Sequence, residues 1–288
     1  MNKLIIKILN KLNIIDKLNL KCKTSINNRI YTIPILGTIG IPNLRTEELW
    51  MITLLKTLVR NDGNNSKFID VGANIGQTLL KIKSVSNEIE YIGFEPNFVC
   101  TFYLNTLVKE NNLTGVKIIP VGISNTTEIG ELEFFHKIKT DSSASIIKNF
   151  RPGNKIDRKA YVPILDISIV KKTINIENMS ILKIDVEGAE LEVLESFQEE
   201  LKKYKSTIII EILPVYNTTN KERLERQLKI MELIQTLDYT IFRIKTHEDK
   251  LINLIEIETI EIHSNINQCE YVFVHKSNLN LINSLLPT

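Results

Sequence analysis

Short apolar segments alternate with longer amphipathic segments from residue 67 to residue 276. Several of the short segments are apolar at almost every position, which is typical of parallel strands buried on both faces of a sheet. Helical periodicity fills most of the gaps between them, for example at 98–112, 188–204 and 221–237. This alternation predicts an α/β fold in which helices cover both faces of a doubly wound, mostly parallel sheet. The strand candidates are KFIDV (67–71), EYIGFE (90–95), VKIIPVG (116–122), ILKIDV (181–186), TIIIEIL (207–213), YTIFRIK (239–245) and EYVFVHK (270–276).

Residues 131–169 interrupt this rhythm with short strand-like pieces around the sequences DSSAS and RPGNK. We interpret this stretch as an insertion of hairpins and loops at the functional edge of the sheet. Residues 46–60 have helical periodicity, and Thr46 is a plausible N-cap residue. We therefore predict an N-terminal extension of residues 1–45 and a single domain of residues 46–288 that contains the insertion.

The first twenty residues, MNKLIIKILNKLNIIDKLNL, form a basic amphipathic pattern. Leu4, Ile5, Ile8, Leu9, Leu12 and Ile15 share one helical face, and the lysines lie largely elsewhere. The predicted helix is too short and too charged to span a bilayer. We favour packing on the domain or on a second subunit, and the alternative is a peripheral position on an anionic membrane surface. Residues 21–44 then predict short strands joined by turns.

Composition limits the function classes only loosely. Three widely spaced cysteines, Cys22, Cys100 and Cys269, show no CxxC spacing, which argues against a disulfide framework or a zinc site. They fit a reduced, cytoplasmic setting. A formal net charge of +2 gives no reason to expect nucleic acid as a partner.

The sequence DVGANIG (70–76) joins the first strand of the series to its helix. In an open parallel sheet, ligands bind at such junctions at the carboxyl ends of the strands. Gly72 allows the backbone to approach a ligand, and Gly76 allows the helix to begin close to the sheet. A dinucleotide-binding turn would have the pattern GxGxxG, but Asn74 stands at the middle glycine position. Asp70 adds a charge that would repel phosphate and would suit an ammonium group.

Glu95 ends the second strand, in the sequence GFEPN. An acidic residue at this place, about twenty residues after the glycine turn, accepts hydrogen bonds from ribose hydroxyl groups. A ligand with a ribose, an ammonium group and no pyrophosphate is S-adenosylmethionine. The sequence therefore predicts an S-adenosylmethionine site, and the alternative is a structural glycine turn beside an unrelated glutamate.

A second informative turn lies in SILKIDVEGAELEVLESF (180–197). The strand brings Asp185 to the carboxyl edge of the sheet, and Glu187 follows beside the positive end of a helix, which favours ionised carboxylates. We expect Glu190, in the first helical turn, to act as a cap rather than as a reagent. The next strand brings Glu211 to the same rim, either for function or for a pair with a nearby cation.

These motifs, together with PVGISN, DSSAS and IIIEI, resemble the FkbM family of S-adenosylmethionine-dependent methyltransferases over about residues 67–243. DVEGAE is the most diagnostic of them. The resemblance implies a Rossmann-like, seven-stranded methyltransferase sheet that is mostly parallel, with an antiparallel last strand. Carried over by motif, the cofactor-binding residues are Asp70, Gly72, Ala73, Asn74, Gly76, Glu95, Pro96, Val121 and Gly122, with the last two beside the adenine.

The implied activity is O-methylation of a hydroxyl group, foremost on a sugar of a surface glycan or its precursor, and otherwise on a small secondary metabolite. Such an acceptor must lose its proton, so a base is needed. We predict Asp185 or Glu187 as this base and Glu211 as a residue that orients the acceptor; His136 and His263 are the alternatives. A magnesium ion held by Asp141, Asp185 and Glu187 could acidify the hydroxyl instead, but no spacing requires a metal.

Three other functions compete. Methyltransferases that act on amines or bases usually carry an Asn/Asp-Pro-Pro-aromatic turn, and this sequence has no Pro-Pro pair. A nicotinamide-dependent oxidoreductase would need the missing glycine at position 74. A non-catalytic cofactor-binding scaffold stays open as an alternative.

The acceptor site should be built from the insertion, the N-terminal hairpin and the loops near Tyr216 and His263. The serines of DSSAS, which are Ser142, Ser143 and Ser145, could line a pocket or simply form a loop. For most of the aromatic residues in these stretches, Phe134, Phe135, Phe150, Tyr161 and Tyr216, we expect packing rather than contact with a sugar. An acceptor attached to a membrane lipid would suit the basic helix.

Overall fold

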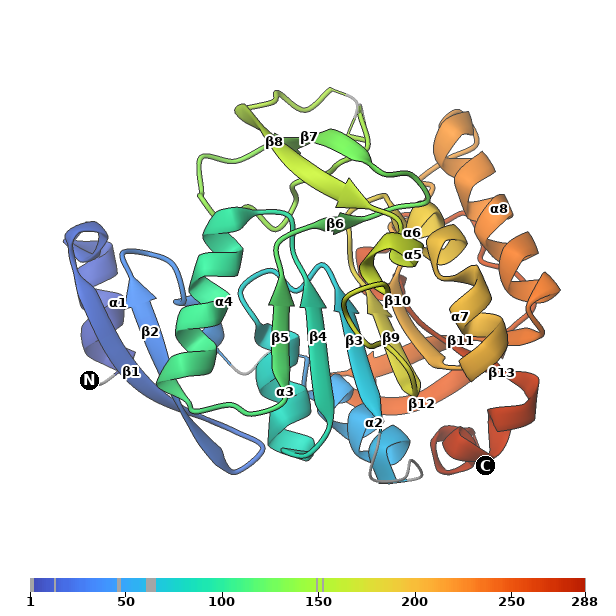
Figure 1. Cartoon of the computed structure of the whole chain (residues 1–288), viewed down its shortest axis with the longest axis horizontal. Helices are drawn as coiled ribbons and strands as arrows, with labels where there is room; N and C mark the ends of the chain where they lie inside the picture. The colour runs from blue at the N-terminus through green and yellow to red at the C-terminus, as the bar shows by residue number, and fades with distance from the viewer. Residues whose placement is uncertain are drawn as a thin grey trace.

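The computed structural model describes residues 3–12, 14–45, 48–60, 66–148, 150–151 and 153–287. Figure 1 shows a central twisted sheet between two layers of helices, a two-stranded hairpin beside α4 at one end, and a small second sheet above the carboxyl edge. The helices are α1 (Lys3–Lys11), α2 (Leu49–Arg60), α3 (Gln77–Val85), α4 (Phe98–Glu110), α5 (Ile167–Val170), α6 (Glu190–Ser196), α7 (Gln198–Tyr204) and α8 (Lys221–Thr236). Short 3₁₀ segments cover Ile15–Lys17, Pro42–Leu44, Ile266–Gln268 and Lys276–Leu285.

The central sheet has the strand order β12-β11-β13-β10-β9-β3-β4-β5 in the described part of the chain. Its strands are β3 (Lys67–Val71), β4 (Glu90–Phe94), β5 (Val116–Ile119), β9 (Met179–Ile184), β10 (Thr207–Glu211), β11 (Tyr239–His247), β12 (Lys250–Ile257) and β13 (Glu270–His275). Strands β5, β4, β3, β9 and β10 are parallel, and β13 lies antiparallel between β10 and β11. The predicted α/β class and the antiparallel last strand are confirmed.

The predicted count of seven strands is one too low. Strand β12 pairs antiparallel with β11 at the edge of the sheet. Glu248 and Asp249 form the connection, and both have positive φ angles, 47° and 63°. A two-residue turn with two positive φ angles matches the right-handed twist of a hairpin. Asn-Gly and Asp-Gly are the sequences typical of such a turn, and neither occurs here. The sequence therefore contains no hairpin signal from which β12 could be predicted.

The N-terminal helix and hairpin are both present. Strands β1 (Asn19–Ile26) and β2 (Arg29–Leu36) pair antiparallel along their full length. Asn27 and Asn28 form the turn with φ angles of 47° and 65°, a conformation that asparagine tolerates well. The predicted N-cap at Thr46 lies outside the described residues. No described helix combines the length and the apolar character needed to cross a membrane.

The stretch predicted as an insertion contains parts of a second sheet. This sheet has the order β6-β8-β7, with β6 (Gly122–Ile123) parallel and β7 (Glu128–Phe134) antiparallel to β8 (Arg158–Leu165). Figure 1 shows it above the carboxyl ends of β4, β5 and β3. The division of the chain at residues 45/46 and the limits of the insertion stay predictions.

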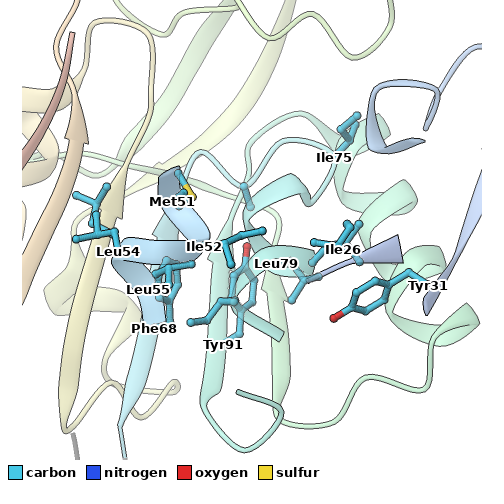
Figure 2. Close-up of a cluster of buried hydrophobic side chains, with 14 of the residues drawn as sticks. Ile26, Tyr31, Met51, Ile52, Leu54, Leu55, Phe68, Ile75, Leu79 and Tyr91 are labelled. Atoms are coloured by element: carbon cyan, nitrogen blue, oxygen red, sulfur yellow. The ribbon is translucent and has the colours of Figure 1, made fainter. Parts of the chain in front are cut away.

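Two buried apolar clusters cover the two faces of the central sheet. One contains residues of α2, α3, α4 and the hairpin, and the other contains residues of α5, α6, α7 and α8. Figure 2 shows part of the first cluster, where α2 side chains such as Leu55 meet Phe68 of β3 and Tyr91 of β4. The rings of Phe68 and Tyr91 are stacked with centroids 5.9 Å apart. The packing of these side chains therefore holds β3 and β4 together near the glycine turn that follows β3.

Candidate functional site

A cavity of about 230 Å³ opens at the carboxyl edge of the central sheet, and residues of the small second sheet, such as Ile123 and Leu132, form part of its lining. Its wall includes most of the residues predicted from the motifs, which are Gly72, Asn74, Glu95, Pro96, Val121, Gly122, Asp185, Glu187 and Glu211. Residues from β3, β4, β9 and β10, far apart in the sequence, thus meet at one place. Asp70, Ala73 and Gly76 do not line this cavity.

Gly72 is required by the packing of two neighbouring turns. Its φ angle is +91°, and a Cβ atom there would lie 1.8 Å from the carbonyl oxygen of Asp185. Gly72 therefore allows the glycine turn to pack closely against the turn that follows β9 (residues 185–188), which we call the β9 turn. Gly76, with a φ angle of +83°, lets α3 begin against α4, because a Cβ atom would lie 2.8 Å from a methyl group of Leu104.

Glu95 is buried, and its carboxylate is held from both sides by backbone amides. The Asn74 amide donates to one oxygen and the Asn97 amide to the other, each at 2.8 Å. Burial raises the pKa of Glu95 to about 7, although the two amide hydrogen bonds favour the ionised form. A carboxylate that is fixed in this way keeps free lone pairs, so it can accept further hydrogen bonds from a ligand in the cavity.

Asp70 lies near the end of β3, directly before the glycine turn. Its carboxyl group is fully buried below the glycine turn, where the Tyr91 hydroxyl donates to it at 2.5 Å. The Lys183 ammonium lies 3.8 Å from its other oxygen. Burial raises the pKa of Asp70, and Lys183 opposes this shift. Asp70 therefore lies behind the cavity wall, and its predicted role toward a ligand's ammonium group stays a prediction.

Asp185 and Glu211 form a pair of carboxyl groups on the wall of the cavity. The two carboxyl groups lie close enough for each to shift the pKa of the other. Lys183 donates to Asp185 at 2.9 Å. Burial disfavours the charge on Asp185, but Lys183 outweighs it and lowers the pKa of this group. Burial and the negative charge of Asp185 raise the pKa of Glu211 to about 10. At neutral pH Asp185 is therefore the ionised member and Glu211 the protonated one.

Glu270 is an acid of this rim that the sequence reasoning missed. It is the strand partner of Glu211 at the start of β13. Burial and the negative charges of Glu48 and Asp185 raise the pKa of Glu270 to about 8. The sequence contained a signal for Glu270, because this residue begins the predicted strand 270–276. A strand that runs antiparallel to its neighbour begins at the edge of the sheet where that neighbour ends.

Glu187 lies at the cavity wall in a left-handed conformation, with a φ angle of 53°. Arg151 of the insertion donates to its carboxylate at 2.5 Å, and the Ser145 hydroxyl donates to its carbonyl oxygen at 2.7 Å. Burial raises the pKa of Glu187 to about 7 against the opposing effect of Arg151. This carboxylate therefore ties the insertion to the β9 turn. Glu190 accepts a hydrogen bond from the Gly188 amide at 2.8 Å, as a capping carboxylate would.

Asp141 organises the loop that holds DSSAS. It accepts hydrogen bonds from the amides of Phe135 and His136 and from the amide and hydroxyl of Ser143. Burial would raise the pKa of Asp141, but these hydrogen bonds lower it to about 2. The side chain is thus fully engaged within its own loop. Ser142 also lines the cavity, whereas Ser143 does not.

The two histidine alternatives stand outside this wall. The imidazole of His136 is largely exposed and contacts Asp141 and Ser143. His263 lies 3.5 Å from the Tyr271 hydroxyl, and burial with nearby Arg243 lowers its pKa. Neither residue lines the cavity. Within the described ranges, no group of three or more His, Cys, Asp and Glu side chains is arranged to hold a metal ion.

The aromatic residues of the insertion and of the loop near Tyr216 differ in their exposure to solvent. Phe134 is buried in the core of the small sheet, and Phe150 packs against Gly188 with the Arg223 guanidinium 4.4 Å from its ring centroid. Packing was the expectation for both. Tyr161 and Tyr216 are exposed. Cys22, Cys100 and Cys269 are all buried, and none of them is joined in a disulfide.

Comparison with known proteins identifies related sequences. The profile of the family described as "Methyltransferase FkbM domain" matches residues 70–266, more than half of the chain. "Methyltransferase sdnD" of Sordaria araneosa is 27% identical over 177 residues, which cover 53% of this chain and 68% of that protein. "Methyltransferase 1" of Beauveria bassiana (strain ARSEF 2860) is 23% identical over 163 residues, 52% of this chain and 65% of that protein.

Among solved structures, the methyltransferase FkbM of Methylobacillus flagellatus KT is 15% identical with a TM-score of 0.45. The superposition covers 73% of this chain and 44% of that chain. The O-methyltransferase of Bacillus cereus, crystallised in complex with SAH, is 12% identical with a TM-score of 0.44, and covers 78% of this chain and 80% of its own. This chain therefore spans less than half of the solved FkbM protein and about two thirds of the two fungal relatives.

Proposed function

Because this chain belongs to the FkbM methyltransferase family, we propose that it is an O-methyltransferase whose acceptor is a sugar hydroxyl group in a surface glycan or its precursor. It is a methyltransferase, and its cofactor is S-adenosylmethionine. When bound, the cofactor supplies a methyl group on a positively charged sulfur, which is an excellent leaving group. The remaining tasks of the protein are to position the acceptor and to accept its proton.

The cavity has the features that such a cofactor needs. Glu95 presents a fixed carboxylate that can accept hydrogen bonds from two ribose hydroxyls. Val121, Gly122 and Ile123 add an apolar wall suited to a purine ring. Since Asn74, two positions after Gly72, replaces the second glycine of the GxGxxG pattern, the turn does not provide the phosphate cradle of a dinucleotide site. The residues present therefore fit an adenosyl group without pyrophosphate.

The observation that carries the proposal is the carboxyl pair of Asp185 and Glu211 on the same wall. Asp185 is kept ionised by Lys183, so it can accept a proton from a hydroxyl group. Glu211 is kept protonated, so it can donate a hydrogen bond and fix the acceptor or Asp185 itself. Glu187 is the other candidate for the base, and its carboxylate is paired with Arg151 as that of Asp185 is paired with Lys183.

The charge of the rim supports a neutral acceptor group. Four carboxyl groups, those of Asp185, Glu187, Glu211 and Glu270, lie close enough to influence one another's pKa values. A phosphate or carboxylate at the reacting end of the acceptor would meet the ionised carboxylate of Asp185 and be disfavoured. A sugar hydroxyl carries no charge and offers both a donor and an acceptor.

A screen of acceptors tests this function directly. The purified chain is incubated with S-adenosylmethionine and with nucleotide sugars, lipid-linked glycans or small hydroxyl compounds, and release of the demethylated cofactor is measured. With the acceptor found, Asp185→Asn should retain cofactor binding and lose at least about 100-fold in turnover. Asp238→Asn, at an exposed turn, is the control.

Two outcomes would contradict the proposal. Full turnover by both Asp185→Asn and Glu187→Gln would remove the assigned base. Tight cofactor binding without transfer to any acceptor would favour a non-catalytic scaffold, and transfer only to small non-glycan compounds would replace the acceptor class.

A further inference from the structure

The N-terminal helix α1 is fixed to the body of the protein along one face only. Ile6 is buried in the cluster that also contains Leu44 and Trp50, and Leu9 packs against this cluster. The Lys3 ammonium donates to the Leu44 carbonyl oxygen at 2.6 Å. The position of α1 is therefore set by the protein itself, without a second chain.

An adjoining face of α1 is apolar and exposed, and Leu12 continues it directly after the end of the helix. Leu4, Ile5, Ile8 and Leu12 have exposed fractions of 61%, 46%, 49% and 60%. With about 100° between successive residues, these four side chains fall within roughly a quarter to a third of the helix circumference. We call them the outer stripe. Figure 1 shows α1 at the end of the molecule, outside the hairpin and away from the central sheet.

Lysines lie beside the outer stripe. Lys7 and Lys11 are exposed. They are four residues apart and therefore lie about one helical turn from each other, along the same edge of the outer stripe. Residues 1–23 contain six lysines and one aspartate, a formal charge of +5, whereas the whole chain carries only +2. The N-terminal segment that carries the outer stripe is thus more basic than the chain as a whole, and Lys7 and Lys11 are its lysines beside the stripe.

This combination selects one kind of partner. Two copies of the helix that paired through the outer stripe would bring like-charged lysines together, which opposes association. An anionic bilayer accepts apolar side chains at the boundary of its acyl chains and attracts lysines at its headgroups. We propose that α1 is a surface-binding helix that docks the protein on a membrane containing anionic lipids. The outer stripe enters the interface, and Lys7 and Lys11 contact the headgroups.

Vesicle sedimentation of the full chain tests the proposal. One set of vesicles contains phosphatidylcholine alone, and the other contains phosphatidylcholine mixed with phosphatidylglycerol. The protein should bind the anionic vesicles at least about tenfold more strongly, and binding should weaken as ionic strength rises. The triple variant Ile5→Ser/Ile8→Ser/Leu12→Ser and the charge variant Lys7→Glu/Lys11→Glu should each lose about tenfold or more in binding.

Matched controls separate docking from loss of fold. Ile129→Ser removes a side chain that is 70% exposed on the small sheet and should bind vesicles like the unchanged protein. Thermal unfolding and calorimetry with S-adenosylmethionine should give the same results for all variants, since neither depends on the outer stripe. The charge variant keeps every apolar side chain, so its result stands even if the triple variant is less stable.

Three results would overturn the proposal. The first is equal binding to neutral and anionic vesicles, and the second is unchanged binding by the two helix variants. The third is no vesicle binding together with self-association that the triple variant abolishes, because this would assign the outer stripe to a second copy of the chain.

Discussion

The ammonium nitrogen of Lys183 lies 2.9 Å from a carboxylate oxygen of Asp185. The same nitrogen is 3.8 Å from Asp70, at the end of the adjacent parallel strand. Burial alone would lower the pKa of Lys183, but the two carboxylates raise it above its usual range. Lys183 is therefore a buried cation that keeps Asp185 ionised.

Replacement of Lys183 by methionine should shift the pH dependence of activity. Without the cation, the pKa of Asp185 should rise, so the acid limb of kcat/KM should move to higher pH. Removal of one partner from a buried ion pair should also cost about 3–5 kcal/mol of unfolding free energy. Lys202→Met is the control, since its pair with Glu199 is exposed on both sides and such surface pairs contribute little to stability. An unmoved acid limb would show that Lys183 does not set the ionisation of Asp185.

The substitution Gly72→Ala should be much more harmful than the same change at another glycine with a positive φ angle. A Cβ atom at Gly72 would collide with the Asp185 carbonyl, whereas one at Gly153, with a φ angle of +87°, meets no atom within 4 Å. We expect about 1–2 kcal/mol of destabilisation for Gly153→Ala and more than about 3 kcal/mol for Gly72→Ala, measured by urea unfolding. Equal losses would mean that the β9 turn moves aside at little cost.

The substitution Glu95→Gln should weaken cofactor binding and leave the fold intact. An amide has one acceptor oxygen, so it cannot accept from Asn74, Asn97 and two ribose hydroxyls together. Calorimetry with S-adenosylmethionine should show a loss of about 10- to 100-fold, equivalent to about 1.4–2.8 kcal/mol. Glu90→Gln, at the other end of the same strand, should have no effect on affinity. Wild-type affinity in Glu95→Gln would place the ribose elsewhere.

The periodicity of the sequence predicted most of the fold because local and tertiary preferences agree in the buried strands. All seven predicted segments overlap strands of the central sheet. The missing strand β12 depends on a turn at Glu248 and Asp249 whose sequence gives no hairpin signal. Propensity could not reveal it, since its pairing with β11 is decided by tertiary contact.

The motifs of the sequence locate the carboxyl ends of the strands, and the part of the site formed by these ends could therefore be predicted. Asp185, Glu187 and Glu211 meet at one cavity because parallel neighbours end at the same edge. The burial of Asp70 was not predictable from its motif, because its partners Tyr91 and Lys183 come from two other strands. The pairing of Glu187 with Arg151 depends on the path of a long loop, which periodicity does not determine.

The stability of the protein should fall as pH rises, and Glu211 should account for part of this fall. Its pKa is raised from an ordinary value of 4.5 to about 10 by burial and by Asp185, so the folded state retains a proton that the unfolded chain releases. The resulting stabilisation is complete below about pH 4.5 and is lost progressively as the pH rises toward 10. In Glu211→Gln this contribution is absent, because the amide does not titrate.

Urea unfolding at several pH values between about 5 and 9 measures this contribution. The unfolding free energy of the unchanged protein should decline more steeply with pH than that of Glu211→Gln. Some decline should remain in the variant, since burial also raises the pKa values of Glu95 and Glu190 to about 7. Glu222→Gln, on the exposed surface of α8, should follow the unchanged protein. Parallel curves for Glu211→Gln and the unchanged protein would show that Glu211 is ionised at neutral pH, and Asp185 would then lose its protonated partner.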